Sequence, residues 1–194
     1  MSQKLLNFVT AISRLASDTT LSPSDVLAKA SGHMAALVAH DDWLPQAMAQ
    51  SHPQHYQQHL LYGDPLDRFS LVSFVWGPGQ FTPVHDHTVW GVIGMLRGAE
   101  QDAPYERAAD GTIRTAGAAR ILKPGDVVTL NPDLGDIHAV SNAVNDQVSI
   151  SIHLYGGNIG RIRRSAYDVR TGQVTSFVSG YSNTLTPNLW ATQP

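Results

Sequence analysis

Two histidines, His85 and His87, stand one residue apart in the stretch PVHDHTVWG. On a strand, residues i and i+2 point to the same face, so two imidazoles about 7 Å apart along the chain could converge on one metal ion. The same alternation turns Asp86 towards the opposite face, where it has at most a supporting role. A third ligand must come from elsewhere in the β-rich part of the chain, where only His138 and His153 remain.

The other five histidines show no comparable pattern, and a single histidine is usually a surface or core residue. His52, His55 and His59 would share one face if their segment were helical, but no acidic residue accompanies them. His33 and His40 have no partner at a useful spacing. We therefore expect no metal ion at any of these five positions.

The first third of the chain carries a helical pattern. Apolar residues recur at spacings of three and four through residues 5–15 and 26–38, which predicts two amphipathic helices. Ser22 followed by Pro23 is a typical helix start. A further helical stretch is expected from Leu44 towards Leu61.

The pattern changes at Phe69, where short runs rich in β-branched and aromatic residues begin to alternate with turn-forming residues. Many short strands with no helices between them indicate an antiparallel sandwich or barrel. We expect one domain over residues 1–194, with helices of residues 1–62 packed on a β-barrel of residues 63–194. The strands are expected at residues 69–76, 88–96, 119–122, 127–130, 147–154 and 161–169.

The composition limits the class of protein. The 194 residues are 42% hydrophobic and 15% charged, which is typical of a globular chain. The net charge of −3 gives no reason to expect nucleic acid or an anionic membrane as partner. There is no cysteine and no apolar run long enough for a membrane span or signal segment. We expect a soluble, cytoplasmic protein that is a monomer or a weak homo-oligomer.

Two longer motifs carry a resemblance to the cupins. The stretch GQFTPVHDH resembles the first cupin motif, G-x5-H-x-H, which Gly98 closes. The stretch PGDVVTLNPDLGDIHAVSN resembles the second motif, with a somewhat longer loop. The resemblance implies a mainly β fold, the double-stranded β-helix, in which His85, His87 and His138 bind one metal ion inside a small barrel.

One departure from the cupin pattern is informative. The first motif usually supplies a Glu soon after the second histidine, but this sequence has Trp90, Gly91 and Val92 there and no acid before Glu100. Three neutral imidazoles would leave a ferrous ion with its full double charge and with open positions. Such a site favours an anionic, chelating substrate, and a thiolate suits it. Trp90 is expected to support the barrel wall.

A second pattern lies in the stretch SIHLY. Ser151, His153 and Tyr155 alternate, so they share one face of a predicted strand, which taken alone could be an ordinary polar face. Together with the three histidines, they resemble the Ser-His-Tyr triad of the cysteine dioxygenase family of thiol dioxygenases, over residues 56–170. The resemblance implies Fe(II) as cofactor, with O2 and a small thiol carboxylate as substrates and a sulfinate as product. Tyr155, oriented by His153 and Ser151, would hydrogen-bond oxygen or substrate and help to move protons.

The carboxylate of the substrate needs a cation. In the animal-type enzymes an Arg two residues after a Tyr provides it, but here Gln58 follows Tyr56 at that offset. A neutral amide cannot replace the charged, bidentate pair. Arg164 resembles the Arg that serves this role in a bacterial Gln-type branch, which is associated with 3-mercaptopropionate. We expect Arg164 and Gln58 to position the carboxylate, and the nearby Arg161 and Arg163 to be solvated.

Animal-type enzymes also carry a Cys that is cross-linked to the active-site Tyr. That Cys aligns near Gly91 or Val92, and this chain has none, so Tyr155 must be a free phenol. Two alternatives stay open because cupin folds host many functions. One is a cupin metalloenzyme of different chemistry, such as an isomerase or another dioxygenase using Zn, Mn or Ni. The other is a ligand-binding cupin without enzymatic activity. The sequence does not fix the preferred thiol.

Overall fold

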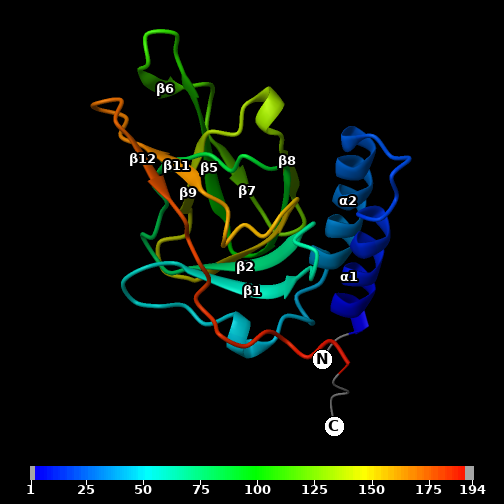
Figure 1. Ribbon diagram of the computed structural model, residues 1–194. Coiled ribbons are helices and arrows are strands. Elements are labelled where there is room, and N and C mark those ends of the chain that lie inside the picture. The colour runs from blue at the N-terminus through cyan, green and yellow to red at the C-terminus, as the bar shows by residue number, and fades with distance from the viewer. Residues whose placement is uncertain (1–2, 191–194) are drawn as a thin grey trace.

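The computed structural model describes residues 3–190 and shows two antiparallel sheets that curl into a small barrel, with two helices along one side (Figure 1). The first sheet has the strand order β1 (Gln57–Gly63), β2 (Ser70–Trp76), β10 (Ser149–Tyr155), β4 (Gly91–Arg97) and β8 (Val127–Leu130). The second has the order β12 (Val174–Phe177), β11 (Arg164–Tyr167), β3 (Val84–His85), β9 (His138–Asn142), β5 (Glu100–Arg107) and β6 (Ile113–Thr115), with β7 (Arg120–Leu122) also on β5. The predicted mainly β fold, a double-stranded β-helix, is confirmed.

The central strands β2 and β10 are buried on both faces. Successive side chains of a strand point to opposite faces, so each strand contributes to two different interiors. On β10, Ile150, Ile152 and Leu154 pack in the core beneath the helices. Its other face carries Ser151, His153 and Tyr155, all of which are buried. The strand period thus places the polar triad inside the barrel.

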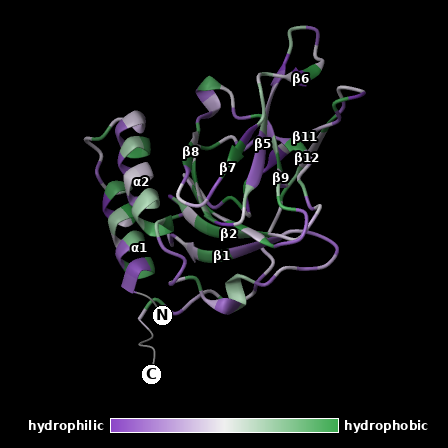
Figure 2. Ribbon diagram, turned by 180° about the vertical axis from the view of Figure 1, so that it is seen from behind, coloured by the Kyte–Doolittle hydropathy of each residue, from purple (hydrophilic) through white to green (hydrophobic). Residues whose placement is uncertain are grey.

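The two predicted helices are confirmed as α1 (Gln3–Leu15) and α2 (Pro23–Val38). Ser22 caps α2 with a capping box, in which its side chain and that of Asp25 each accept from the other's backbone N–H. Helix α2 packs closely on β4. The glycine at residue 94 permits this approach, because a β-carbon there would lie only 2.6 Å from Met34 Cγ. Figure 2 shows hydrophobic and hydrophilic residues sharing the surface of each helix.

The expected helix from Leu44 towards Leu61 is wrong. This segment contains one short 3-10 turn, η1 (Gln46–Met48), and then the strand β1, which pairs with the edge of β2. Pairing with a distant strand overrides the local apolar spacing, and prolines interrupt the segment at Pro45 and Pro53. The boundary between the helical part and the barrel therefore lies near residue 56 and not residue 62.

The shared helical face suggested for His52, His55 and His59 is consequently absent. His52 and His55 stack outside any helix or strand, with ring centroids 3.9 Å apart, whereas His59 lies on β1 with Nε2 3.2 Å from the carbonyl oxygen of Gln50. The expected domain limits, residues 1 and 194, lie outside the described residues. None of the described helices has the length and apolar character needed to cross a membrane.

Candidate functional site

Three histidines converge inside the barrel. His85 ends β3 and lies directly opposite His138 of β9, its cross-strand partner. His87 follows two residues later, and the three rings have centroids 4.8 to 5.0 Å apart. One ring nitrogen from each lies within 4.8 Å of the others, and all three side chains are buried. The sequence pair and the distant His138 thus form one cluster.

The ring nitrogens that face away from the cluster are held by hydrogen bonds. His85 Nδ1 donates to the carbonyl oxygen of Pro83 at 3.0 Å, and His138 Nδ1 donates to Asp102 Oδ1 at 2.7 Å. A carbonyl and a carboxylate only accept, so both rings keep Nε2 free as a ligand atom. Burial raises the pKa of Asp102, but the hydrogen bonds from His138 and Arg120 outweigh it and lower that pKa, so the acceptor is anionic.

His87 is positioned through its backbone. The N–H groups of His87 and Thr88 donate to Asp136 Oδ2 at 2.7 and 3.2 Å. These bonds support a left-handed conformation at Thr88, with φ of 60°, that turns the chain sharply after the histidine. His87 Nδ1 itself lies 3.6 Å from Asp136 Oδ2, too far for a good hydrogen bond.

The cluster fits a divalent transition metal. Burial lowers the pKa of His85 well below its ordinary value, and burial lowers the pKa of His87 to about 4. Both imidazoles are therefore neutral at physiological pH and offer lone pairs. Three imidazole nitrogens without a carboxylate match ions such as Fe(II), Zn or Cu, and are a poor match for Mg or Ca, which prefer oxygen.

Asp86 takes no part in this cluster. Its Oδ1 accepts from the backbone N–H of Ser165 at 2.8 Å, and its Oδ2 accepts from the Tyr167 hydroxyl at 2.7 Å. The carboxylate therefore fastens β3 to the neighbouring strand β11. This placement agrees with the strand alternation, which turns residue 86 away from the two histidines.

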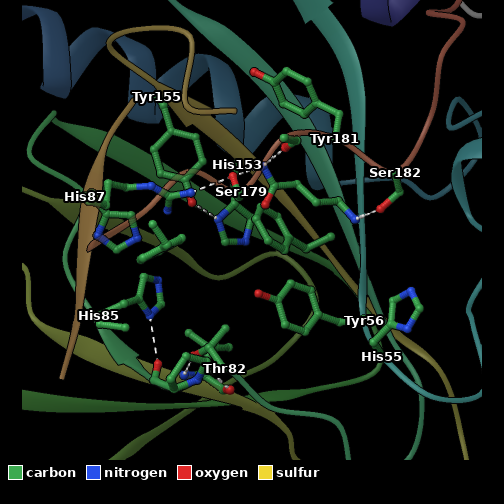
Figure 3. Close-up of a pocket in the computed structure, with 18 of the residues that line it drawn as sticks. His55, Tyr56, Thr82, His85, His87, His153, Tyr155, Ser179, Tyr181 and Ser182 are labelled. Atoms are coloured by element: carbon green, nitrogen blue, oxygen red, sulfur yellow. Dashed lines mark hydrogen bonds between the residues drawn. The ribbon is translucent and has the colours of Figure 1, made fainter. Parts of the chain in front are cut away.

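The triad residues form a continuous chain of hydrogen bonds beside the histidines. Ser151 Oγ lies 2.8 Å from His153 Nε2, and His153 Nδ1 lies 2.8 Å from the Tyr155 hydroxyl. The Tyr155 ring stacks on His87 with centroids 5.6 Å apart. Burial lowers the pKa of His153 and raises that of Tyr155, so both groups are neutral. Figure 3 shows His153 and Tyr155 facing the same space as His85 and His87.

Gly91 lies against the ring of Tyr155. The two residues are cross-strand partners, and a β-carbon at Gly91 would lie 3.2 Å from Tyr155 Cδ1. A cysteine at residue 91 would therefore have stood next to the phenol ring. With glycine there, and no cysteine in the chain, Tyr155 is a free phenol.

A cavity of about 560 Å³ opens over these groups and contains the two substrate-binding candidates in its wall. Arg164 is buried, with its guanidinium 4.7 Å from the Phe177 ring centroid and Nη2 donating to Ser179 Oγ at 2.7 Å. Gln58 Nε2 also donates to Ser179 Oγ, at 3.1 Å. Ser179 thus joins two residues that lie 106 positions apart (164 minus 58). Arg161 and Arg163 are exposed.

Sequence reasoning did not identify the residues of the C-terminal segment in this wall. Residues 177–182 return across the cavity, where Tyr181 donates to Asn158 and Ser182 accepts from the backbone of Gln58. Figure 3 shows Tyr181 and Ser182 bordering the cavity. They belong to no motif, so no local sequence signal marks them. Asp102 was missed as well, because β5 has too few apolar residues to resemble a strand.

Comparisons with known proteins give a consistent result. A family model described as cysteine dioxygenase type I matches residues 34–170. Cysteine dioxygenase type 1 of Bos taurus is 28% identical over 109 residues, covering 54% of this chain and 52% of that protein. The Danio rerio protein of the same name is 26% identical over 129 residues, covering 64% and 58%. This chain therefore spans about half the length of the curated relatives it matches.

Solved structures of low identity also resemble the barrel. A conserved protein with a double-stranded beta-helix domain from Klebsiella pneumoniae is 16% identical, with a TM-score of 0.47, over 61% of this chain and 88% of that one. A cupin 2 domain-containing protein from Halorhodospira halophila is 17% identical, with a TM-score of 0.46, over 62% and 76%. These likenesses carry no information about function.

The family match covers most of the chain and includes the parts that build the site. Residues 34–170 contain the three clustered histidines, the Ser-His-Tyr chain and Arg164. The match does not extend to the C-terminal segment that closes the cavity. The chain belongs to the cysteine dioxygenase type I family.

Proposed function

We propose that this protein is an Fe(II)-dependent thiol dioxygenase that adds both atoms of O2 to the sulfur of a small thiol carboxylate, forming a sulfinate. One observation carries the proposal: a buried three-histidine cluster, a buried phenol on a hydrogen-bonded chain and a buried arginine share a single cavity. His85, His87 and His138 would hold the iron. Bound Fe(II) would supply open coordination positions for a thiolate and for O2.

Arg164 is the residue we assign to the substrate carboxylate. Its side chain is buried, and its Nε has no hydrogen-bond partner among the described residues. Burial also lowers its pKa, although not enough to remove the charge of a guanidinium. Among the described residues, no acidic side chain forms an ion pair with Arg164. A substrate carboxylate would supply this counter-ion and would accept charge-assisted hydrogen bonds from the guanidinium. Gln58 and Ser179 would keep the guanidinium in position.

The cavity wall favours 3-mercaptopropionate over cysteine. The two thiols share a carboxylate, but cysteine adds an ammonium group that must be satisfied when it leaves water. None of the described residues that line the cavity is Asp or Glu. A substrate without an amine therefore matches this wall better, and we assign 3-mercaptopropionate as the preferred thiol.

Tyr155 is the residue we assign to proton handling at the reacting end of the substrate. The reaction R–SH + O2 → R–SO2⁻ + H⁺ breaks the O–O bond, forms two S–O bonds and releases the thiol proton, with O2 oxidising the sulfur. The Tyr155 hydroxyl is buried and neutral, and the ring that carries it stacks on His87, so the hydroxyl can donate a hydrogen bond to developing negative charge. His153 and Ser151 hold the hydroxyl in that orientation through their 2.8 Å contacts.

The test is oxygen uptake by protein that has been loaded with Fe(II) under anaerobic conditions. Three thiols separate the possibilities: 3-mercaptopropionate, cysteine, and cysteamine, which has an amine and no carboxylate. We expect kcat/KM to be highest for 3-mercaptopropionate and lowest for cysteamine. Mass spectrometry with ¹⁸O2 should show two labelled oxygen atoms in the sulfinate.

The same measurements decide between the alternatives. A fully iron-loaded protein that consumes no oxygen with any of the thiols would exclude a thiol dioxygenase. Activity of another kind with Zn, Mn or Ni would then indicate a different cupin metalloenzyme. A ligand-binding protein would keep its affinity for the thiol after metal removal, whereas the proposed enzyme would lose it.

A further inference from the structure

One buried acid next to the triad has no role in the function proposed above. Glu100, the first residue of β5, is 1% exposed, opposite Asn142 of β9 and Leu122 of β7. Among the described residues, no group forms a hydrogen bond with its Oε1. Burial raises the pKa of its carboxyl to about 8, against the opposing influence of the Ser151 hydroxyl and the Trp76 indole beside it. Glu100 is therefore mostly protonated near pH 7.

In the Ser151–His153–Tyr155 chain, each group can act either as hydrogen-bond donor or as acceptor towards its neighbour. A hydroxyl can donate or accept, and a neutral imidazole has one donor and one acceptor nitrogen that can exchange roles. The chain from Ser151 through His153 to Tyr155 could therefore run either way. Trp76 Nε1 lies 3.4 Å from Ser151 Oγ, but an indole only donates and so is compatible with both directions.

We propose that Glu100 is the fourth member of this chain, a positioning residue whose proton decides whether Tyr155 presents its O–H to the cavity. The inference rests on the proposed function, because it concerns the donor that faces the reacting atoms. It adds a residue that belongs to neither the cupin motifs nor the triad.

With the proton on Glu100, every bond in the chain points towards the cavity. In the proposed arrangement the acid would donate to Ser151 Oγ, whose hydroxyl influences the Glu100 carboxyl. Ser151 then donates to His153 Nε2, and His153 Nδ1–H donates to the Tyr155 oxygen. The phenol proton of Tyr155 then has no partner within the chain and is free to point into the cavity.

Loss of that proton reverses the chain. A carboxylate only accepts, so Ser151 must donate to it, His153 carries its proton on Nε2, and Tyr155 donates to His153 Nδ1. The two states differ by one proton, and Ser151, His153 and Tyr155 each keep one throughout. In the second state the phenol offers only a lone pair to the cavity.

The charges around Glu100 are compatible with this exchange. On its own strand, the Asp102 carboxylate raises the pKa of Glu100 and is itself bound to Arg120 of β7 and His138 of β9. From β10, His153 and Tyr155 face Glu100 through Ser151, and both are neutral because burial lowers the pKa of the first and raises that of the second. Among the described residues, no Lys or Arg side chain shifts the pKa of the Glu100 carboxyl.

The first test needs no metal and no substrate. Nitrogen-15 NMR of histidine-labelled, metal-free protein distinguishes the two neutral tautomers of an imidazole. In the wild type, one buried histidine should change from the Nδ1–H to the Nε2–H tautomer as the pH rises through about 8. In Glu100→Gln, whose amide N–H can donate to Ser151 at every pH, the same imidazole should keep the Nδ1–H tautomer. A single tautomer throughout this range in the wild type would overturn the inference.

The second test uses oxygen uptake by the iron-loaded protein as a function of pH. Wild-type kcat should fall as the pH rises through about 8, whereas the kcat of Glu100→Gln should lack this alkaline decline, whatever its value at neutral pH. Tyr155→Phe should have a low residual activity that does not decline at alkaline pH, because it lacks the phenol proton whose direction Glu100 would control. Asp64→Asn is the matched control: it neutralises a buried acid that pairs with Arg68 outside the cavity, and it should retain the decline.

The outcomes separate this inference from the proposed function. No oxygen uptake with any thiol would refute the proposed function, while the tautomer measurement would still decide the role of Glu100. Oxygen uptake with the same alkaline decline in the wild type and in Glu100→Gln would refute the role of Glu100 and leave the dioxygenase intact.

Discussion

Burial sets the charge state of the polar side chains around the cavity. It lowers the pKa of His85, His87 and His153 and raises that of Tyr155. Each of these groups is therefore neutral near pH 7, and each has a defined partner or a free lone pair. The charge left inside the site belongs to Arg164, which suits an anionic ligand.

Tyr155→Phe should lower kcat about 100-fold, because a positioned proton donor contributes about 10²-fold or more to a rate. The ring remains, so its packing on His87 is kept and the histidine cluster should bind iron as in the wild type. Steady-state oxygen uptake and iron analysis of the same preparation measure the two effects. A large loss of iron would instead assign Tyr155 to the integrity of the site.

Arg164→Ala should raise KM for 3-mercaptopropionate about 10- to 100-fold, because a hydrogen bond to a charged group is worth about 1.5–3 kcal/mol. The adjacent Arg163→Ala is the control, since Arg163 is exposed and donates to Ser176 Oγ on the surface, at 3.3 Å. Steady-state kinetics of both variants decide the assignment. Equal KM values for Arg164→Ala and the wild type would remove Arg164 from the carboxylate site.

At the scale of elements, neighbouring strands bring the reacting groups together. Cross-strand pairing sets His85 against His138, and the next strand along the sheet, β5, supplies Asp102 behind His138. The opposite sheet supplies the triad from β10, which lies between β2 and β4. The rigidity of the site therefore depends on the register of these strands, and on the helix α2 that covers the outer face of β4.

Gly94→Val should destabilise the protein by about 1–3 kcal/mol, because it overpacks a closed interface. A β-carbon there would meet Met34 and Val38 at 2.6 to 2.9 Å, and the valine methyl groups need still more space. Gly32 lies on the exposed side of helix α2, and a β-carbon added there would have no atom within 4 Å. Gly32→Ala should therefore stabilise the protein by about 0.5–1 kcal/mol. Urea unfolding measures both; a neutral Gly94→Val would show that α2 can move away from β4.

At the scale of the whole molecule, the fold closes a mainly apolar interior around several ionisable groups. Keeping Glu100 protonated has a consequence for stability. Its unfolded carboxyl ionises near pH 4.5, whereas burial raises the folded pKa to about 8. As the pH rises, the unfolded state therefore releases the Glu100 proton before the folded state does. The contribution of this group to the free energy of unfolding is complete below about pH 4.5 and is lost as the pH rises to about 8.

Glu100→Gln should therefore raise the melting temperature relative to the wild type more at pH 8 than at pH 5. Asp64→Asn should instead lower the melting temperature by a similar amount at pH 5 and at pH 8. The hydrogen bond from Arg68 lowers the pKa of Asp64, so this carboxyl is ionised in both the folded and the unfolded state over that range. Thermal unfolding of the metal-free proteins at several pH values measures both trends. A Glu100→Gln difference that does not change with pH would contradict a raised pKa.

The sequence by itself determined the features that depend on local periodicity. The strand period of two united His85 with His87, excluded Asp86 from their face and aligned Ser151, His153 and Tyr155, because side-chain direction on a strand is a local property. The helical period likewise predicted α1 and α2.

Only the tertiary structure decided what depends on contacts between distant residues. Gln57–Gly63 became a strand because β2 offered a free edge to pair with, which local apolar spacing cannot reveal. The polar strand β5 forms because Glu100 and Asp102 point into the barrel and Asp102 finds His138 there. The closing wall forms because Ser179 reaches both Gln58 and Arg164. Each of these contacts joins residues that only folding brings together.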